Sequence, residues 1–189
     1  QLHNQELQKQ MLDVCKNSQP NNNNNNNSNN NNSNNNSSNN KTFNLQFFLN
    51  EQCKDAMNIS DFVNSFQLKL EDLEKVGEQG YVNGMSNIII DKIKETDIYK
   101  RPFHCSDAKR ETLYVKDENG WEREGAENAK MIKAVKDVGQ KNFTILNNYR
   151  LSHPECVLAE AADNDKYVRM MMQAAGSQKD NVNKVIKKI

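Results

Sequence analysis

The amino-acid sequence predicts a mainly helical α+β domain over residues 42–189, preceded by a short helix and a disordered linker. Three observations favour this class. A tract of 16 Asn and 4 Ser from Asn21 to Asn40 separates the chain into two unequal parts. Beyond the tract, apolar residues recur mostly at three- and four-residue spacing, which is typical of amphipathic helices. An Asn119–Gly120 pair lies between two strand-like runs, and it is the strongest hairpin signal in the chain.

The part before the domain divides at Pro20. Residues 1–16 have the apolar spacing of a short amphipathic helix that resembles the end of a coiled coil, but so few turns are too weak to be stable alone. A homo-oligomer through this helix is one expectation. Residues 17–41 are predicted to be a disordered linker, because Asn side chains compete for backbone hydrogen bonds and the tract offers nothing to bury.

Two helices are expected early in the domain. Helical spacing favours a first helix capped at its start by Ser60, with 67–70 as a site for a break. Gly77 and Gly80 end this element. A second helix is predicted over residues 81–95, where an Ile-rich middle indicates a buried face.

The pattern changes to that of extended chain over residues 101–124. Pro102 is incompatible with continuation of the preceding helix. The runs that follow are rich in strand-forming residues and turn back at Asn119–Gly120. A small antiparallel sheet is therefore predicted around Tyr114 and Trp121.

Three further helices are predicted in the helical C-terminal part, residues 126–189. The first covers residues 126–149, with an interruption near Gly139. The second begins with Ser152 as its N-cap, because a proline and a glutamate follow at favourable positions. Ser177 is expected to cap the third.

The charge of the chain is balanced but unevenly distributed. Lys plus Arg and Asp plus Glu both number 25, which excludes a global field that would attract DNA or lipid. Residues 51–78 hold seven acids and three bases, whereas residues 166–189 hold six bases and one acid. Such a protein either offers a basic face or simply has solvated helix faces.

The sequence does not predict contact with a membrane. No run approaches the ~18–20 apolar residues of a membrane span, and no signal-peptide pattern opens the chain. An intracellular protein is therefore expected.

No pattern in the chain predicts catalysis. There is no Gly-rich phosphate loop, no Ser-centred elbow and no HExxH sequence. Cys105 follows His104, but adjacent residues on a strand point to opposite faces, so this imidazole is badly placed to activate the thiol. We predict a protein that is not an enzyme and that binds no cofactor through this chain.

Two residue pairs offer four soft ligands for zinc, namely His104–Cys105 and His153–Cys156. Structural zinc sites usually space paired ligands by two to four residues, and the adjacent first pair violates this spacing. Ordinary packed or surface side chains are the preferred interpretation, and no metal ligand is assigned.

Nucleic-acid binding has more support. Helices, a hairpin and a lysine-lined helix follow one another in a loosely winged-helix-like order. The cations expected to contact DNA or RNA flank the extended region or face outward after it: Lys100, Arg101, Lys109, Arg110, Arg123, Lys130, Lys133 and Lys136. Interleaved acids leave a solvated rim as the alternative. A scaffold or oligomerisation module, tethered by the linker, is the competing hypothesis.

Five segments carry a resemblance to a known family. The most specific is Arg-Pro-Phe-His-Cys-Ser-Asp at 101–107, and the others are residues 43–51, 57–65, 113–122 and 183–187. Across residues 42–189 the chain resembles a family of uncharacterised proteins of giant DNA viruses.

The resemblance implies a context rather than a mechanism. Members of that family commonly have an N-terminal two-Cys, two-His zinc finger, a Gln-rich helical segment and an Asn-rich spacer. It therefore implies a zinc finger upstream of Gln1, so that any zinc would be bound outside this chain. It also implies a viral protein of the host cytoplasm, viral factory or nucleus, and it favours DNA as a partner.

Overall fold

The computed structural model describes residues 44–189. The predicted helix over 1–16, its oligomer contact and the linker over 17–41 lie outside this range. The described elements, in chain order, are α2 (Leu45–Phe47), η1 (Phe48–Gln52), α3 (Ile59–Asn64), α4 (Leu70–Gln79), α5 (Tyr81–Glu95), η2 (Ile98–Lys100), β1 (Phe103–Asp107), β2 (Thr112–Asp117), β3 (Gly120–Arg123), α6 (Ala129–Ser152), η3 (Pro154–Val157), α7 (Asn164–Ala174) and α8 (Lys179–Lys188).

The predicted α+β class, mainly helical with one small antiparallel sheet, is confirmed. The sheet has the strand order β1-β2-β3. In the β2–β3 hairpin Asp117 pairs with Gly120 and Val115 with Glu122, so the chain turns where the Asn-Gly pair predicts. Gly120 has a φ of 111°, a conformation that side chains with a Cβ rarely adopt.

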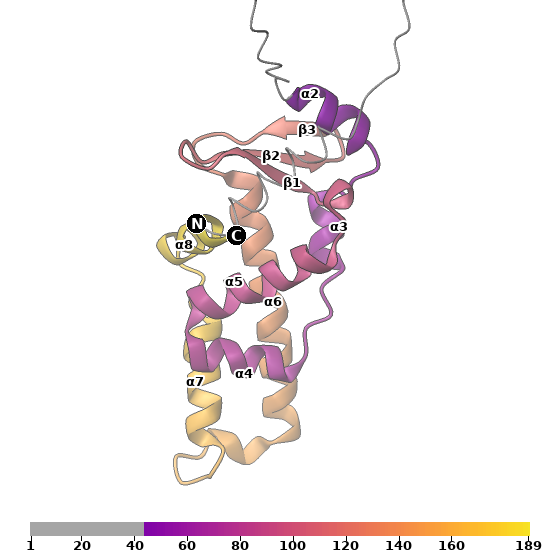
Figure 1. Cartoon of the computed structure of the whole chain (residues 1–189). Coiled ribbons are helices and arrows are strands. Elements are labelled where there is room, and N and C mark those ends of the chain that lie inside the picture. The colour runs from indigo at the N-terminus through magenta and orange to yellow at the C-terminus, as the bar shows by residue number, and fades with distance from the viewer. Residues whose placement is uncertain (1–43) are drawn as a thin grey trace, which may run out of the picture.

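The sheet lies at one end of the molecule, between a cap and a set of helices (Figure 1). The cap is formed by α2, η1 and the turn that follows them as far as Ala56. On the other side α6 runs from the sheet to the opposite end, where it packs with α4 and α7, while α8 packs on α5 and α6 near the sheet.

Strand alternation gives the two faces of the sheet different cores. Phe103 and Val115 belong to the main core with side chains of α3, α5, α6 and α8. Tyr114 and Trp121 pack against the cap, in which Phe48 is fully buried. Burial of one such aromatic side chain contributes about 1.5–3 kcal/mol, so even the short cap is a substantial part of the fold.

The first predicted helix is split. α3 ends at Asn64 and α4 begins at Leu70, so a break is present, but it covers residues 65–69 instead of 67–70. The residue at the N-cap of α3 is Asn58, not Ser60. Gly77 lies inside α4, whereas Gly80, with a φ of 80°, separates α4 from α5.

The prediction that a helix begins at Ser152 is wrong. Ser152 is the last residue of α6, and its hydroxyl donates to the carbonyls of Asn148 and Tyr149, which are at the end of that helix. Pro154 starts only the short η3, and α7 begins at Asn164. The hydroxyl thus serves the C-terminal end of one helix instead of the N-terminal end of the next.

Two further boundaries differ from the prediction. α6 is continuous through Gly139, because this glycine is buried beside the Tyr81 side chain rather than placed at a bend. α8 has Gln178 at its N-cap, one residue after the predicted Ser177.

Gly84 and Gly139 provide a matched test of helix packing. A Cβ at Gly84 would lie 2.6 Å from Cα of Val76, whereas a Cβ at Gly139 would make an ordinary 3.5 Å contact with the Tyr81 hydroxyl. We expect Gly84→Ala to lower the free energy of unfolding by about 1–2 kcal/mol through overpacking. Gly139→Ala should leave it unchanged or raise it by up to about 1 kcal/mol through helix propensity. Urea titration measures both, and equal effects would contradict the close approach of α4 and α5.

Candidate nucleic-acid interface

The cations predicted on either side of β1 do not converge. Lys100 precedes β1, while Lys109 and Arg110 lie in the β1–β2 turn, at the other end of the sheet. A five-residue strand spans about 17 Å at ~3.3 Å per residue. Lys100 also donates to the carbonyl of Asp55 at 3.3 Å, which directs it toward the cap.

Arg101 is not a surface cation. It is 9% exposed, and its Nε donates to the Thr96 carbonyl at 3.1 Å, beyond the end of α5. Burial lowers the pKa of Arg101, and the nearby Asp97 carboxylate partly offsets that effect. The prediction that its guanidinium contacts phosphate is therefore corrected: in this structure it faces the α5–β1 connection.

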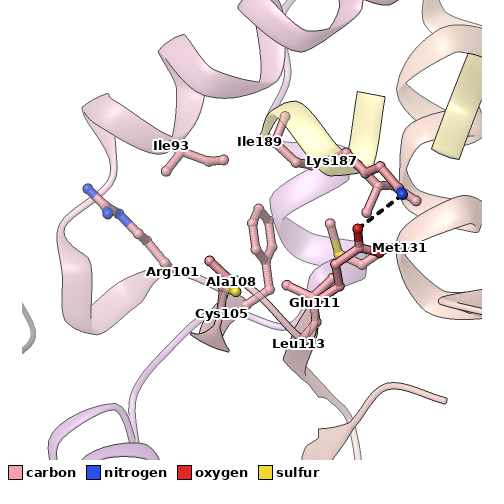
Figure 2. A pocket seen from close by; sticks show the side chains of 11 residues that line it. Ile93, Arg101, Cys105, Ala108, Glu111, Leu113, Met131, Lys187 and Ile189 are labelled. Atoms are coloured by element: carbon pink, nitrogen blue, oxygen red, sulfur yellow. Dashed lines mark ion pairs between the residues drawn. The ribbon is translucent and has the colours of Figure 1, made fainter. Parts of the chain in front are cut away.

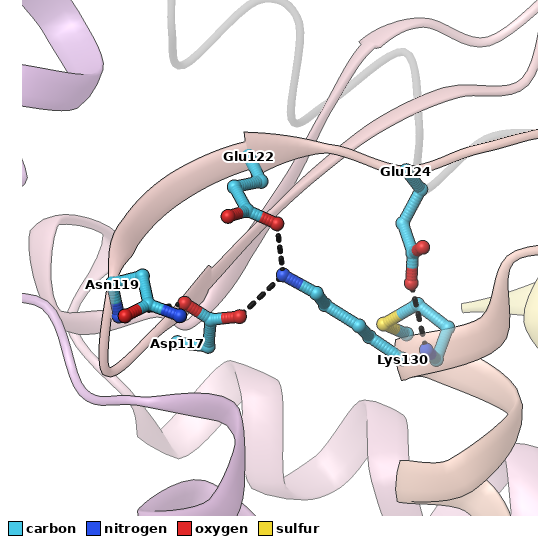
Figure 3. Close-up of polar contacts among 6 residues, drawn as sticks. Asp117, Asn119, Glu122, Glu124 and Lys130 are labelled. Carbon is cyan, nitrogen blue, oxygen red and sulfur yellow. Dashed lines mark hydrogen bonds and ion pairs between the residues drawn. The ribbon is translucent and has the colours of Figure 1, made fainter.

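Lys130 is held between two carboxylates of the β2–β3 hairpin, Asp117 and Glu122 (Figure 3). Partial desolvation opposes its charge, but the two hydrogen bonds outweigh this effect and raise the pKa of Lys130. One residue later, the Met131 N–H donates to Glu124 at 2.9 Å. These contacts fix the start of α6 against the sheet, so Lys130 is charge-compensated and does not form part of a basic surface.

The β2–β3 hairpin does not project as a wing. Its Trp121 Nε1 donates to the carbonyl of Cys53 in the cap at 3.4 Å, and Lys130 connects its other side to α6. Arg123 lies at the end of β3 away from the hairpin turn, opposite Tyr114 of β2. The expectation that this hairpin is a wing, as in a winged-helix domain, is therefore wrong.

Lys133 and Lys136 are exposed on α6, in agreement with their predicted outward orientation. Lys133 lines a groove between α3, the hairpin turn and α6, but Asp117, Glu118 and Asp137 line the same groove. This surface is of mixed charge.

A different group of cations does come together, around the β1–β2 turn. Lys187 of α8 forms an ion pair with Glu111 of that turn, with 3.0 Å between Nζ and Oε1. Lys184 lies three residues earlier on the same helix and is exposed. Figure 1 shows α8 next to this end of the sheet. We name the following set the basic edge: Lys109, Arg110, Lys184 and Lys187. Arg123 is not part of it, because its β-sheet partner Tyr114 packs on the cap side of the sheet, opposite the side on which α8 lies.

The β1–β2 turn has a defined shape. The backbone N–H groups of Lys109 and Arg110 both donate to Oδ1 of Asp107, at 2.9 and 3.1 Å. This Asx-type arrangement positions two consecutive cations at the tip of the turn. Asp107 and Glu111 are the acids of the turn, and they form ion pairs with Arg110 and Lys187, respectively.

The sequence predicted two members of the basic edge, Lys109 and Arg110, and did not indicate Lys184 and Lys187. The signal was present in the excess of bases over acids in residues 166–189. The sequence could not indicate that α8 packs beside the β1–β2 turn, because the contact joins Glu111 to Lys187, which is 76 residues later in the chain.

His104 and Cys53 form a buried pair under the cap. Both side chains are fully buried, with 3.7 Å between Cys53 Sγ and His104 Nε2. Burial raises the pKa of Cys53 to about 12; burial, assisted by the positive Arg101, lowers the pKa of His104 to about 3. Thiol and imidazole are therefore both neutral, and neither acts as a nucleophile or base near neutral pH.

His104 and Cys105 lie on opposite faces of β1, as strand alternation predicts. His104 packs between Phe48 and Trp121 of the cap side, with ring centroids 5.0 and 5.4 Å away. Cys105 lines a cavity on the other face. His153 instead stacks on Tyr149 at 4.5 Å. Within residues 44–189 no group of three or more His, Cys, Asp or Glu side chains is arranged to hold a metal ion.

Comparison with known proteins adds no relative: no family model, curated protein or solved structure matches the chain. Among the helices of residues 44–189, none has the length and apolar character needed to cross a membrane.

The buried imidazole predicts a specific pH dependence of stability. The folded-state pKa of His104 is below its ordinary value of 6.5, so the unfolded chain binds a proton that the folded chain does not. Above pH 6.5 His104 is neutral in both the folded and the unfolded chain, so it does not affect the free energy of unfolding. As the pH falls from 6.5 toward 3, only the unfolded chain is protonated at His104, so the free energy of unfolding decreases. Relative to His104→Phe, the natural chain should lose about 1 kcal/mol per pH unit between pH 6 and 4.

Urea unfolding at a series of pH values measures this difference. Other titrating groups are shared by the two proteins and cancel in the comparison. Parallel stability profiles would show that His104 is not buried as a neutral ring.

Proposed function

We propose that the domain is a non-enzymatic nucleic-acid-binding module that contacts phosphates through the basic edge. The observation that carries the proposal is the meeting of the β1–β2 turn with α8, which gathers cations from two distant parts of a chain with no net charge. Local concentration of cations is sufficient for phosphate contact, because screening confines such interactions to about 8–10 Å. The resemblance to giant-virus proteins supports an intracellular role.

The acids of the turn do not prevent this function. Arg110 is 85% exposed at its side chain and only 3.7 Å from Asp107, and the Glu111–Lys187 pair is also largely exposed. Exposed ion pairs contribute ~0–1 kcal/mol, so a phosphate group can replace either carboxylate as the partner of the cation. Phosphate contacts of this type give affinity without sequence preference.

Neutralising the turn tests the proposal. We expect Lys109→Gln/Arg110→Gln to weaken binding of a DNA duplex at low salt by about tenfold or more. It should also reduce the slope of log K against log salt concentration by about 1–2, because each phosphate contact contributes about 0.9. Fluorescence anisotropy over a salt series measures both quantities.

The matched control is Lys75→Gln/Arg169→Gln, which removes the same charges from exposed positions on α4 and α7. This variant should bind like the natural chain. Equal losses in both variants would indicate only a response to net charge, and absence of salt-dependent binding by the natural chain would refute the proposal.

A scaffold role is a second candidate, favoured by an apolar surface at the other end of the molecule. Leu151, Val157 and Leu158 are 68, 51 and 61% exposed around the connection from α6 to α7. We name these three residues the apolar tip. Met172 of α7 is likewise 64% exposed, whereas Met170 is buried in the helical core. Several exposed large apolar residues around one connection favour contact with another protein.

Charged substitutions test whether the tip mediates self-association. We expect Leu151→Asp/Leu158→Asp to convert an oligomer of the natural chain to monomer, because two carboxylates cannot be buried there without partners. Multi-angle light scattering over a concentration series measures the mass. Ala126→Asp/Ala129→Asp, at exposed positions near the sheet, is the matched control. A natural chain that stays monomeric, or an oligomer that survives the tip variant, would exclude this role of the tip.

A further inference from the structure

A cavity of about 100 Å³ lies beneath the basic edge, between the sheet, α5, α6 and α8. Figure 2 shows side chains from these elements around it. Its walls are mainly apolar, and the residues that form them are Ile93, Phe103, Leu113, Met131, Ile186 and Ile189.

The polar groups of the cavity are few and placed at its margin. Glu111 and Lys187, the ion pair between the turn and α8, are both lining residues (Figure 2). Cys105 contributes a half-buried thiol. Arg101 lines the wall with its aliphatic stem, while its guanidinium points away toward the end of α5.

The Glu111–Lys187 pair is suited to exchange of one partner. Both side chains are more than half exposed, at 53 and 61%. Glu111 also has a φ of 51°, a left-handed conformation that is uncommon for residues other than glycine. The carboxylate that now neutralises Lys187 is therefore weakly bound and carried by a strained backbone position.

We propose that this cavity binds a short aliphatic carboxylate, with its chain among the apolar walls and its carboxylate on Lys187. The apolar lining favours a hydrocarbon chain and provides few groups to recognise a polar body. An apolar cavity of ~150 Å³ accommodates benzene, so the smaller volume here suits a chain of about four or five carbons. The ligand carboxylate replaces Glu111 as the partner of Lys187.

Cys105 provides a direct readout, because a ligand in the cavity covers its thiol. The full chain with Cys15→Ser is used, since Cys53 and Cys156 are fully buried. Pentanoate is titrated at constant pH and ionic strength while an aromatic disulfide reagent modifies Cys105. We expect saturable protection in the millimolar range, with the modification rate reduced at least threefold. Acetate, which has the same charge without the chain, should protect little.

Lys187→Gln isolates the carboxylate contact. It should weaken protection by pentanoate at least fivefold while leaving the weaker protection by 1-pentanol unchanged. Lys136→Gln, which removes one exposed cation elsewhere on the surface, is the matched control and should behave like the parent. Methyl NMR of the isoleucines provides a second readout, with pentanoate expected to shift the signals of Ile93 and Ile186.

Three results would overturn the proposal. These are protection that does not saturate, equal protection by acetate and pentanoate, and isoleucine methyl signals that pentanoate leaves unshifted. Because pentanoate binding is measured without nucleic acid, failure here is distinguishable from failure of the basic edge to bind DNA.

Discussion

Alternation along β1 is the constraint on which the rest of the structure depends. Phe103 and Cys105 face the helices, whereas His104 faces the cap. Successive side chains of a strand point to opposite faces, so a strand covered on both faces must have suitable buried residues at alternate positions for each side. The neutral His104 packs against aromatic rings on the cap side. Phe103 belongs to the main core, which also includes the buried side chains of α8 and so places that helix near the β1–β2 turn.

Three half-buried lysine side chains connect elements of this domain, so their charges contribute little to a basic surface. Lys116 donates to the carbonyl of Ala56 in the cap, and Lys141 donates to the carbonyl of Phe66 after α3. Lys130 joins the hairpin to α6. Among the cations that remain at the surface, Lys109, Arg110, Lys184 and Lys187 gather where α8 meets the β1–β2 turn, so charge and packing together define the candidate interface.

Local signals predicted the fold class, the helix over residues 81–95 and the hairpin at Asn119–Gly120, because glycine, proline and apolar spacing act over short distances. Caps were less predictable, since the Ser152 hydroxyl can either accept at a helix start or donate at a helix end, and only tertiary packing decides. The candidate site was only partly predictable. Burial of Arg101 and compensation of Lys130 depend on contacts that sequence spacing does not reveal, as does the approach of Lys187 to Glu111.

The placement of α8 against the β1–β2 turn is tested most directly by zero-length carbodiimide coupling followed by peptide mass spectrometry. This chemistry joins a carboxylate to an amine only where the two are in contact. The structure predicts a Glu111–Lys187 cross-link, together with links from Lys130 to Asp117 or Glu122 as an internal standard. Recovery of the Lys130 links without the Glu111–Lys187 link would contradict the account, because the basic edge and the cavity beneath it both require that contact.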